Sequence, residues 1–162
     1  MSNKRIIELT IARAKCRKCG FERILYFTSG FNYGERVVST KDGKLCAYSN
    51  LLTENIIPEL YKYCRALFQD MNITVTESEL ARIIPNLYGI TCDPISGEKV
   101  DTFSYLKCNN CLDGIMEEDE AFGEKTKKLE AVYVTHNIWN QLDDIEKRDR
   151  VVKELRRLKY LF

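Results

Sequence analysis

The sequence predicts a single α+β domain, in which strands flank a helical middle and a helix ends the chain. Apolar residues alternate with polar ones on both sides of the middle, they recur at helical spacing within it, and 162 residues suit one domain. We expect the β portion at about 1–49 and 88–134, a helical insertion at about 50–87, and a C-terminal helix at about 136–160.

Two hairpins are expected in the first part of the chain. Apolar side chains alternate from Ile7 to Ile11 and lead into the turn CRKCG at 16–20. The aromatic and β-branched run at 21–27 then predicts the returning strand. A second hairpin is expected at 37–48, because the turn KDGK at 41–44 tolerates positive φ.

Two helices are expected in the middle. The first begins near Asn55, because Pro58 is tolerated only in a first turn. A second begins at Thr76, where a capping box with Glu79 is possible, and ends near Pro85. One face of the first helix collects the apolar residues Ile57, Leu60, Tyr61, Cys64, Leu67, Phe68 and Met71.

Strands are expected again after the helices. The segment 88–107 reads as strand with a turn at Ser96–Gly97, and 129–134 as the last strand. Either Thr135 or Asn137 is expected to cap the C-terminal helix. This helix carries four acid–base pairs at i,i+4 spacing: Asp143 with Lys147, Asp144 with Arg148, Glu146 with Arg150, and Asp149 with Lys153.

Seven cysteines are the most informative feature, and four of them form two C-x-x-C pairs. Cys16 and Cys19 form the first pair, and Cys108 and Cys111 form the second. Each pair can direct both sulfurs into one site, so together they predict a tetrahedral set of four thiolates, which suits Zn²⁺. An odd cysteine count, with no stretch of signal-peptide type, predicts reduced thiols in the cytoplasm.

The segment CRKCGFERILYF at 16–27 resembles the zinc-ribbon superfamily. The resemblance implies a zinc-ribbon-like antiparallel β portion whose structural zinc would be held by Cys16, Cys19, Cys108 and Cys111. Two features depart from compact ribbons, since 88 residues separate the pairs and Leu112 stands where glycine follows the first pair. The superfamily includes transcription factors, polymerase subunits and ribosomal proteins, so the resemblance selects no single function.

Spacing alone leaves other uses of the cysteines open. Four cysteines also suit an iron–sulfur cluster, and a C-x-x-C pair can be a redox pair. Cys46 and Cys64 fall in a predicted strand and on a predicted helix face, so we expect both to be core residues. Cys92 could replace a ligand, or act as a nucleophile with His136 as its base.

The charges predict no general attraction to nucleic acid, because the formal net charge is +1. Positive charge is local, and an acidic stretch at 117–120 offsets it. Basic side chains interleaved with aromatic ones can bind phosphates and stack on bases. The candidate surface for nucleic acid or a protein partner consists of Lys15, Arg17, Lys18, Arg23, Phe31 and Tyr33.

We expect a non-enzymatic binding or adaptor protein with a structural Cys₄ zinc site and a protein partner. The alternatives are a nucleic-acid-binding zinc-ribbon protein and a cysteine-dependent enzyme that uses Cys92 and His136. The sequence has no Walker loop, no G-x-G-x-x-G motif and no nucleophile elbow. No run of 18 apolar residues occurs, so no membrane partner is expected.

Overall fold

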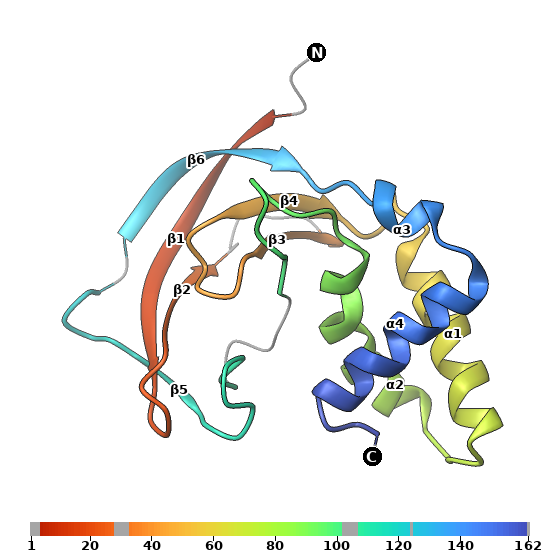
Figure 1. The fold of residues 1–162 in the computed structure, drawn as a ribbon. Coiled ribbons are helices and arrows are strands. Elements are labelled where there is room, and N and C mark those ends of the chain that lie inside the picture. Colours follow the sequence, from red (N-terminus) through yellow and green to blue (C-terminus); the bar gives the residue numbers. More distant parts are fainter. Residues whose placement is uncertain (1–3, 28–32, 102–106, 124, 162) are drawn as a thin grey trace.

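The computed structural model describes residues 4–27, 33–101, 107–123 and 125–161, and it shows a mixed α+β fold (Figure 1). Six strands form one sheet in the order β2-β1-β6-β4-β3, with β5 paired to β1 beside this path. The strands are β1 (Lys4–Cys16), β2 (Glu22–Phe27), β3 (Glu35–Ser39), β4 (Cys46–Asn50), β5 (Met116–Glu118) and β6 (Lys125–Tyr133). The two expected N-terminal hairpins are present as β1–β2 and β3–β4.

The long strand β1 organises the sheet. Its 13 residues pair with β2 along one edge, and along the other edge with β6 near its start and with β5 at its end. All these pairings are antiparallel, but β4 and β6 run parallel, so the expectation of a purely antiparallel β portion was wrong. The helical segment between β4 and β6 supplies the crossover that a parallel pair requires.

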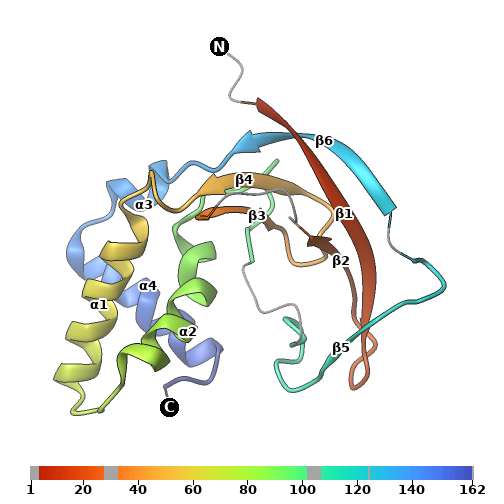
Figure 2. The ribbon, with the colours of Figure 1, turned by 180° about the vertical axis from the view of Figure 1, so that it is seen from behind.

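The sheet curls until its two edge strands approach each other (Figures 1 and 2). The Ile24 N–H on β2 donates to the Asp42 carbonyl in the β3–β4 turn at 2.9 Å. Gly43 makes this approach possible, because a Cβ there would lie 2.2 Å from the Ile24 carbonyl oxygen. The inner face of the curl buries a small apolar cluster of Ile7, Leu9, Tyr48 and Ala131.

The helices gather at one side of the sheet, away from β1, β2 and β5 (Figures 1 and 2). They are α1 (Ile56–Asp70), α2 (Glu77–Leu87), α3 (Asn137–Gln141) and α4 (Asp144–Arg157), with a short 3₁₀ helix η1 (Tyr88–Thr91) after α2. Asn55 is the N-cap of α1 and Thr76 forms a capping box with Glu79, as predicted. Among the described residues, no helix has both the length and the apolar character to cross a bilayer.

The helix α2 continues through Pro85 to Leu87, so its predicted end was two residues early. The predicted strand at 88–107 was also wrong in its described part, although Ser96 and Gly97 do form a turn with positive φ. Burial explains both differences. Leu87 and Tyr88 are fully buried in the main core, and this packing outweighs the local preferences of Pro85 and of a β-rich sequence.

The C-terminal helix is broken into α3 and α4, because Asp143 caps α4 through a capping box with Glu146. The predicted caps of α3 were wrong as well. Asp93 accepts from the backbone N–H groups of Asn137 and Ile138 at 2.9 Å, so the cap comes from a distant loop. Two cations predicted to pair within α4 bind α1 instead: Lys147 pairs with Glu59, and Arg148 with Asp70.

Candidate metal centre

The two cysteine pairs, 92 residues apart at their first members, converge on one site. The four Sγ atoms all lie within 4.8 Å of one another. Cys16 Sγ lies 3.8 Å from Cys111 Sγ, and Cys19 Sγ lies 3.7 Å from Cys108 Sγ. The arrangement could therefore hold a metal ion, as the spacing of the two pairs predicted.

Each pair lies in a turn with the same backbone geometry. Gly20 donates its N–H to the Cys16 carbonyl at 3.0 Å, and Leu112 donates to the Cys108 carbonyl at the same distance. Gly20 has φ +77° and Leu112 has φ +65°. Leu112 thus adopts the left-handed conformation that glycine adopts in the first turn, at a cost of roughly 1–2 kcal/mol.

Backbone N–H groups point at the sulfurs, as a site that stabilises thiolates requires. In these contacts the donor nitrogens lie close to the sulfur atoms: Lys18 N is 3.3 Å from Cys16 Sγ, Asn110 N is 3.3 Å from Cys108 Sγ, and Gly114 N is 3.2 Å from Cys111 Sγ. The same turn that brings the two cysteines of a pair together therefore also supplies the donors.

The protonation of the thiols follows from these donors and from burial. A backbone hydrogen bond from Phe21 is the main cause of the lowered pKa of Cys19, and one from Asp113 lowers the pKa of Cys111. Burial raises the pKa of Cys108, which is fully enclosed. A bound cation would favour the thiolate form at all four positions, including the buried Cys16 and Cys108.

Gly114 closes the site on one side. A Cβ at this position would lie 2.2 Å from Cys16 Sγ and 3.1 Å from Cys111 Sγ, well inside van der Waals contact. Sequence reasoning did not select Gly114 as a site residue, because it lies outside both C-x-x-C pairs. Glycine is required there for steric reasons alone. These reasons can be recognised only once the first turn is known to lie against the second.

Side chains fasten the second turn to distant parts of the fold. Asn109 is 1% exposed and donates from Nδ2 to the Lys41 carbonyl in the β3–β4 turn at 2.9 Å. The Asp113 carboxylate pairs with Lys18 of the first turn at 3.4 Å and with Lys159 after α4 at 2.6 Å. The centre therefore lies where four segments of the chain meet.

The spacing of the sulfurs fits a single tetrahedral ion. With Zn–S bonds of about 2.3 Å, the sulfur atoms of a tetrahedral site lie about 3.8 Å apart. The distances Cys19–Cys108 and Cys16–Cys111, 3.7 and 3.8 Å, match this value. All seven cysteines are free thiols, and Cys64 is buried in the helical core as expected, while Cys46 is half-buried on β4.

The predicted cationic surface is partly neutralised. Lys15, Arg17 and Lys18 are exposed on and after the end of β1. However, Arg17 pairs with Glu117 at 2.9 Å, and Lys18 pairs with Asp113. The pairing of β5 with β1 brings Glu117 to Arg17, and the sequence pattern did not indicate this pairing.

Arg23 does not belong to the same exposed surface. Arg23 is only 7% exposed and lies opposite Ala14 in the register of β1 and β2, on the face of the sheet opposite Lys15. Tyr33 is 88% exposed. Phe31 lies outside the residues that the structure describes.

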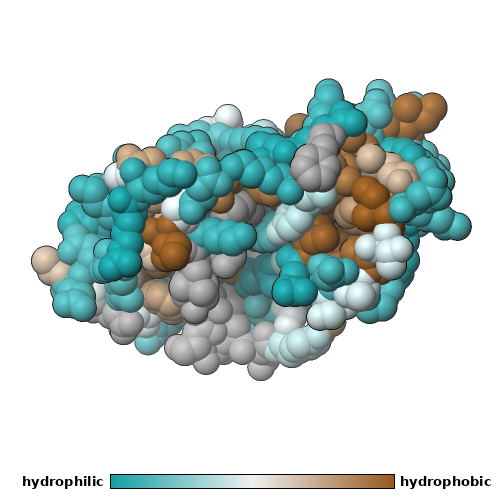
Figure 3. Space-filling model, turned by 90° about the horizontal axis from the view of Figure 1, so that it is seen from below, coloured by the Kyte–Doolittle hydropathy of each residue, from teal (hydrophilic) through white to brown (hydrophobic). Residues whose placement is uncertain are grey.

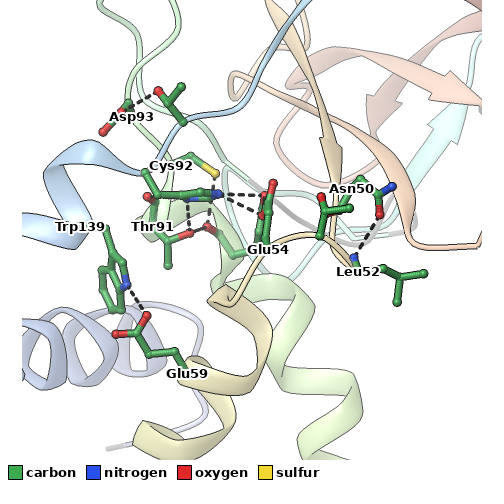
Figure 4. A network of polar contacts seen from close by, with 12 residues as sticks. Asn50, Leu52, Glu54, Glu59, Thr91, Cys92, Asp93 and Trp139 are labelled. Atoms are coloured by element: carbon green, nitrogen blue, oxygen red, sulfur yellow. Dashed lines mark hydrogen bonds and ion pairs between the residues drawn. The ribbon is translucent and has the colours of Figure 1, made fainter.

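Cys92 and His136 lie in one polar network near the start of α3 (Figure 4). Burial raises the pKa of Cys92 to about 12, and its Sγ donates to the Tyr88 carbonyl at 3.4 Å. His136 is engaged on both ring nitrogens, with Nδ1 2.9 Å from the Thr91 carbonyl and Nε2 3.0 Å from the Glu54 carboxylate. These contacts suit a structural role, because they connect three parts of the chain: η1, α3 and the loop that precedes α1.

The electrostatics of His136 follow from the same contacts. Burial lowers its pKa, but the hydrogen bond to Glu54 and that to the Thr91 carbonyl outweigh burial, so its pKa is raised. Because a carbonyl only accepts, the contact with Thr91 assigns a proton to Nδ1. The raised pKa means that His136 keeps its second proton to a higher pH than an exposed imidazole does, and the doubly protonated ring attracts the Glu54 carboxylate.

Comparison of this chain with models of known families, with curated proteins and with solved structures finds no match. The likeness to the zinc-ribbon superfamily therefore rests on the two cysteine turns. The function has to be argued from the geometry of the chain itself.

Proposed function

We propose that the four cysteines bind one structural Zn²⁺ ion and that the chain is a non-enzymatic binding or adaptor protein. The observation that carries the zinc assignment is the convergence of four sulfurs at tetrahedral spacing. Zinc would be held by Cys16, Cys19, Cys108 and Cys111, as in the zinc-ribbon superfamily that the first turn resembles. Four protein thiolates leave no open coordination position, which supports a structural role.

Two other uses of the cysteines have less support. A polynuclear iron–sulfur cluster places several atoms between the cysteines on its different irons, so its four ligands cannot all lie as close together as 4.8 Å. A thioredoxin-like redox pair lies at the start of a helix. Cys16 is instead the last residue of β1, and among the described residues no helix begins at or directly after either pair.

Metal analysis of the protein, purified without chelators, tests the zinc proposal. We expect about one equivalent of zinc per chain and no visible absorption, because Zn²⁺ has no d–d transitions. Replacing Cys19 with serine should remove the zinc and lower the melting temperature, whereas Cys64→Ser, outside the centre, should retain the zinc. Less than half an equivalent of zinc in the wild type, or bound iron in its place, would contradict the proposal.

The proposal of a binding role draws on the state of Cys92 and His136. A thiol with a pKa near 12 is a poor nucleophile at neutral pH, and both nitrogens of His136 are used in structural contacts. Tyr33, with its ring almost fully exposed, is the described residue that best suits contact with a protein partner. We expect a partner retained by the tagged wild type to be lost from Tyr33→Ser.

An exposed apolar residue elsewhere provides the control for this experiment. Ile145 on α4 is 73% exposed, so Ile145→Ser removes a similar apolar surface from the helical layer. A partner lost equally from both variants would indicate general stickiness, and a partner retained by Tyr33→Ser would refute the assignment of Tyr33.

Nucleic-acid binding by the first turn is the weaker candidate, since its exposed cations already pair with carboxylates. Anisotropy measurements with single- and double-stranded probes at about 50 mM salt test it, because phosphate contacts are strongest at low salt.

A further inference from the structure

A groove of about 690 Å³ lies between the edge strands β2 and β3 on one side and α2 and the segment after α4 on the other. Figure 3 shows a recess with hydrophilic residues near the middle of the face seen from below. The volume is within the range of about 300–1,000 Å³ that is typical of small-molecule sites. We call it the cationic groove, because its lining includes Arg23, Arg36, Arg82 and Lys107.

The charge of the groove is not balanced by its own residues. Asp101 is the one acidic residue in its described lining, and that carboxylate already pairs with Arg157 at 3.4 Å. In the part of the chain that the structure describes, Arg36, Arg82 and Lys107 have no ion-pair partner. An anion entering the groove would meet an excess of positive charge in a partly enclosed space, where charges interact more strongly than in water.

Arg23 is the most unusual member of this group. Its side chain is enclosed, yet Nε and Nη1 have no hydrogen-bond partner within the described structure. Burying a cation with unused donors is costly, and such groups in folded proteins are often found where a ligand supplies the missing acceptors. Arginine stays charged even where burial lowers its pKa, as it does here.

The groove also has aromatic walls. Phe27 of β2 lines it on the sheet side, and Tyr160 lines it on the helical side. Aromatic rings on opposite walls of a narrow groove favour a flat ring between them or against one of them. The lining thus combines guanidinium groups, which bind phosphate through two parallel hydrogen bonds, with surfaces for a planar group.

We propose that the cationic groove binds a small phosphorylated molecule with a planar ring, a nucleoside phosphate, whose phosphate accepts hydrogen bonds from Arg23. Arg36, on the other edge strand, adds charge to the same phosphate site, and the aromatic walls hold the ring. This proposal goes beyond the structural role of the metal and does not depend on which ion the cysteines bind.

Calorimetric titration of the purified, metal-containing protein tests the proposal with three probes: ADP, inorganic pyrophosphate and adenosine. We expect ADP to bind most tightly, pyrophosphate to bind more weakly, and adenosine to bind at least about tenfold more weakly than ADP, because charge-assisted hydrogen bonds to Arg23 are lost. Arg23→Met should weaken ADP binding by at least about tenfold and should raise the melting temperature of the ligand-free protein, since a buried unpaired cation is removed.

Arg17→Met is the matched control, because Arg17 is exposed and lies outside the lining of the groove. Its ADP affinity should equal that of the wild type. If Arg23→Met fails to fold, Arg36→Met tests the same site from the other edge strand and should weaken ADP binding by at least about threefold.

Several results would overturn the proposal. Absence of ADP binding up to about 1 mM would do so, as would equal ADP affinity in the wild type and in the folded variants of Arg23 and Arg36. Binding of a single-stranded oligonucleotide without ADP binding would assign the groove to a polynucleotide instead. Loss of zinc from Arg23→Met, with unchanged ADP affinity, would show that Arg23 only offsets the charge of the thiolates.

Discussion

Replacing Gly114 with alanine should damage the metal centre more than the fold. The added Cβ would lie 2.2 Å from Cys16 Sγ and 3.1 Å from Cys111 Sγ, whereas non-bonded heavy atoms settle at about 3.5–4.0 Å. Gly114 does not have a positive φ, so alanine introduces no backbone strain of its own. The effect must therefore come from the contacts of the added Cβ, of which that with Cys16 Sγ is the shortest and a further one joins it to Lys18 Cβ at 3.1 Å.

The size of the effect follows from how far a sulfur must move. Relief of the contact requires Cys16 Sγ to shift by more than 1 Å, roughly, while metal–ligand distances tolerate only about ±0.2 Å. Overpacking of this kind costs about 1–3 kcal/mol, and here the cost falls on the metal-bound form. We expect the zinc dissociation constant to rise by about 10- to 100-fold.

Competition with a chromophoric zinc chelator measures this constant. Gly97→Ala is the control, because Gly97 has a positive φ of 81° but nothing within 4 Å of its added Cβ. The control should lower stability slightly and leave the zinc affinity unchanged. A dissociation constant for Gly114→Ala within about threefold of the wild type would refute the claim that Gly114 is required for space around the sulfurs.

Three further comparisons of variants probe the turns and the histidine network, each followed by urea denaturation. Leu112→Val should be less stable than Leu112→Gly by about 1–2 kcal/mol, because a β-branched residue fits the left-handed conformation poorly; equal stabilities would contradict this. Gly43→Ala should cost about 2–4 kcal/mol, more than Gly97→Ala, because the Ile24 backbone blocks its Cβ. The raised pKa of His136 gives stability that is present below the ordinary value of 6.5 and is lost as pH rises through the folded-state value. Glu54→Gln should reduce this dependence, so that the wild type loses its advantage over the variant as the pH rises above 6.5; an unchanged difference would refute the pairing.

The parts of the fold that local rules decide were predictable. The start of α1 next to Asn55 and the capping box at Thr76 depend on a few neighbouring residues, and both are present. The convergence of the two cysteine pairs was predictable for a different reason. Each C-x-x-C turn flanked by strands supplies two of the four ligands of a tetrahedral site. Metal binding brings the two pairs together whatever the length of the chain between them.

The parts that depend on distant contacts were not predictable from the sequence. Asp93 caps α3 from a loop more than 40 residues away, and β5 brings Glu117 to Arg17. The parallel pairing of β4 and β6 joins strands that are separated in the chain by α1, α2 and β5. Arg23 was placed on an exposed surface because its neighbours are basic, but the alternation along β2 turns it to the enclosed side.

The position of the metal centre suggests a coupling between metal and ligand. Lys107 and Leu112 border the second cysteine turn and also line the cationic groove, and Arg23 lies a few residues after Cys19. Removing the metal leaves the two turns joined by the backbone hydrogen bond from the Arg17 N–H to the Ile115 carbonyl at 3.1 Å and by side-chain contacts such as Lys18 with Asp113, an exposed pair worth about 0–1 kcal/mol.

The residues that line the groove should then lose their fixed arrangement. Ligand binding would have to order them again, and the free-energy cost of that ordering would weaken the affinity. Chelation of the metal should therefore weaken ADP binding as well as lower the melting temperature, and restored zinc should reverse both effects. Metal-free protein that remains folded and binds ADP as tightly as the zinc form would show that the groove is independent of the centre.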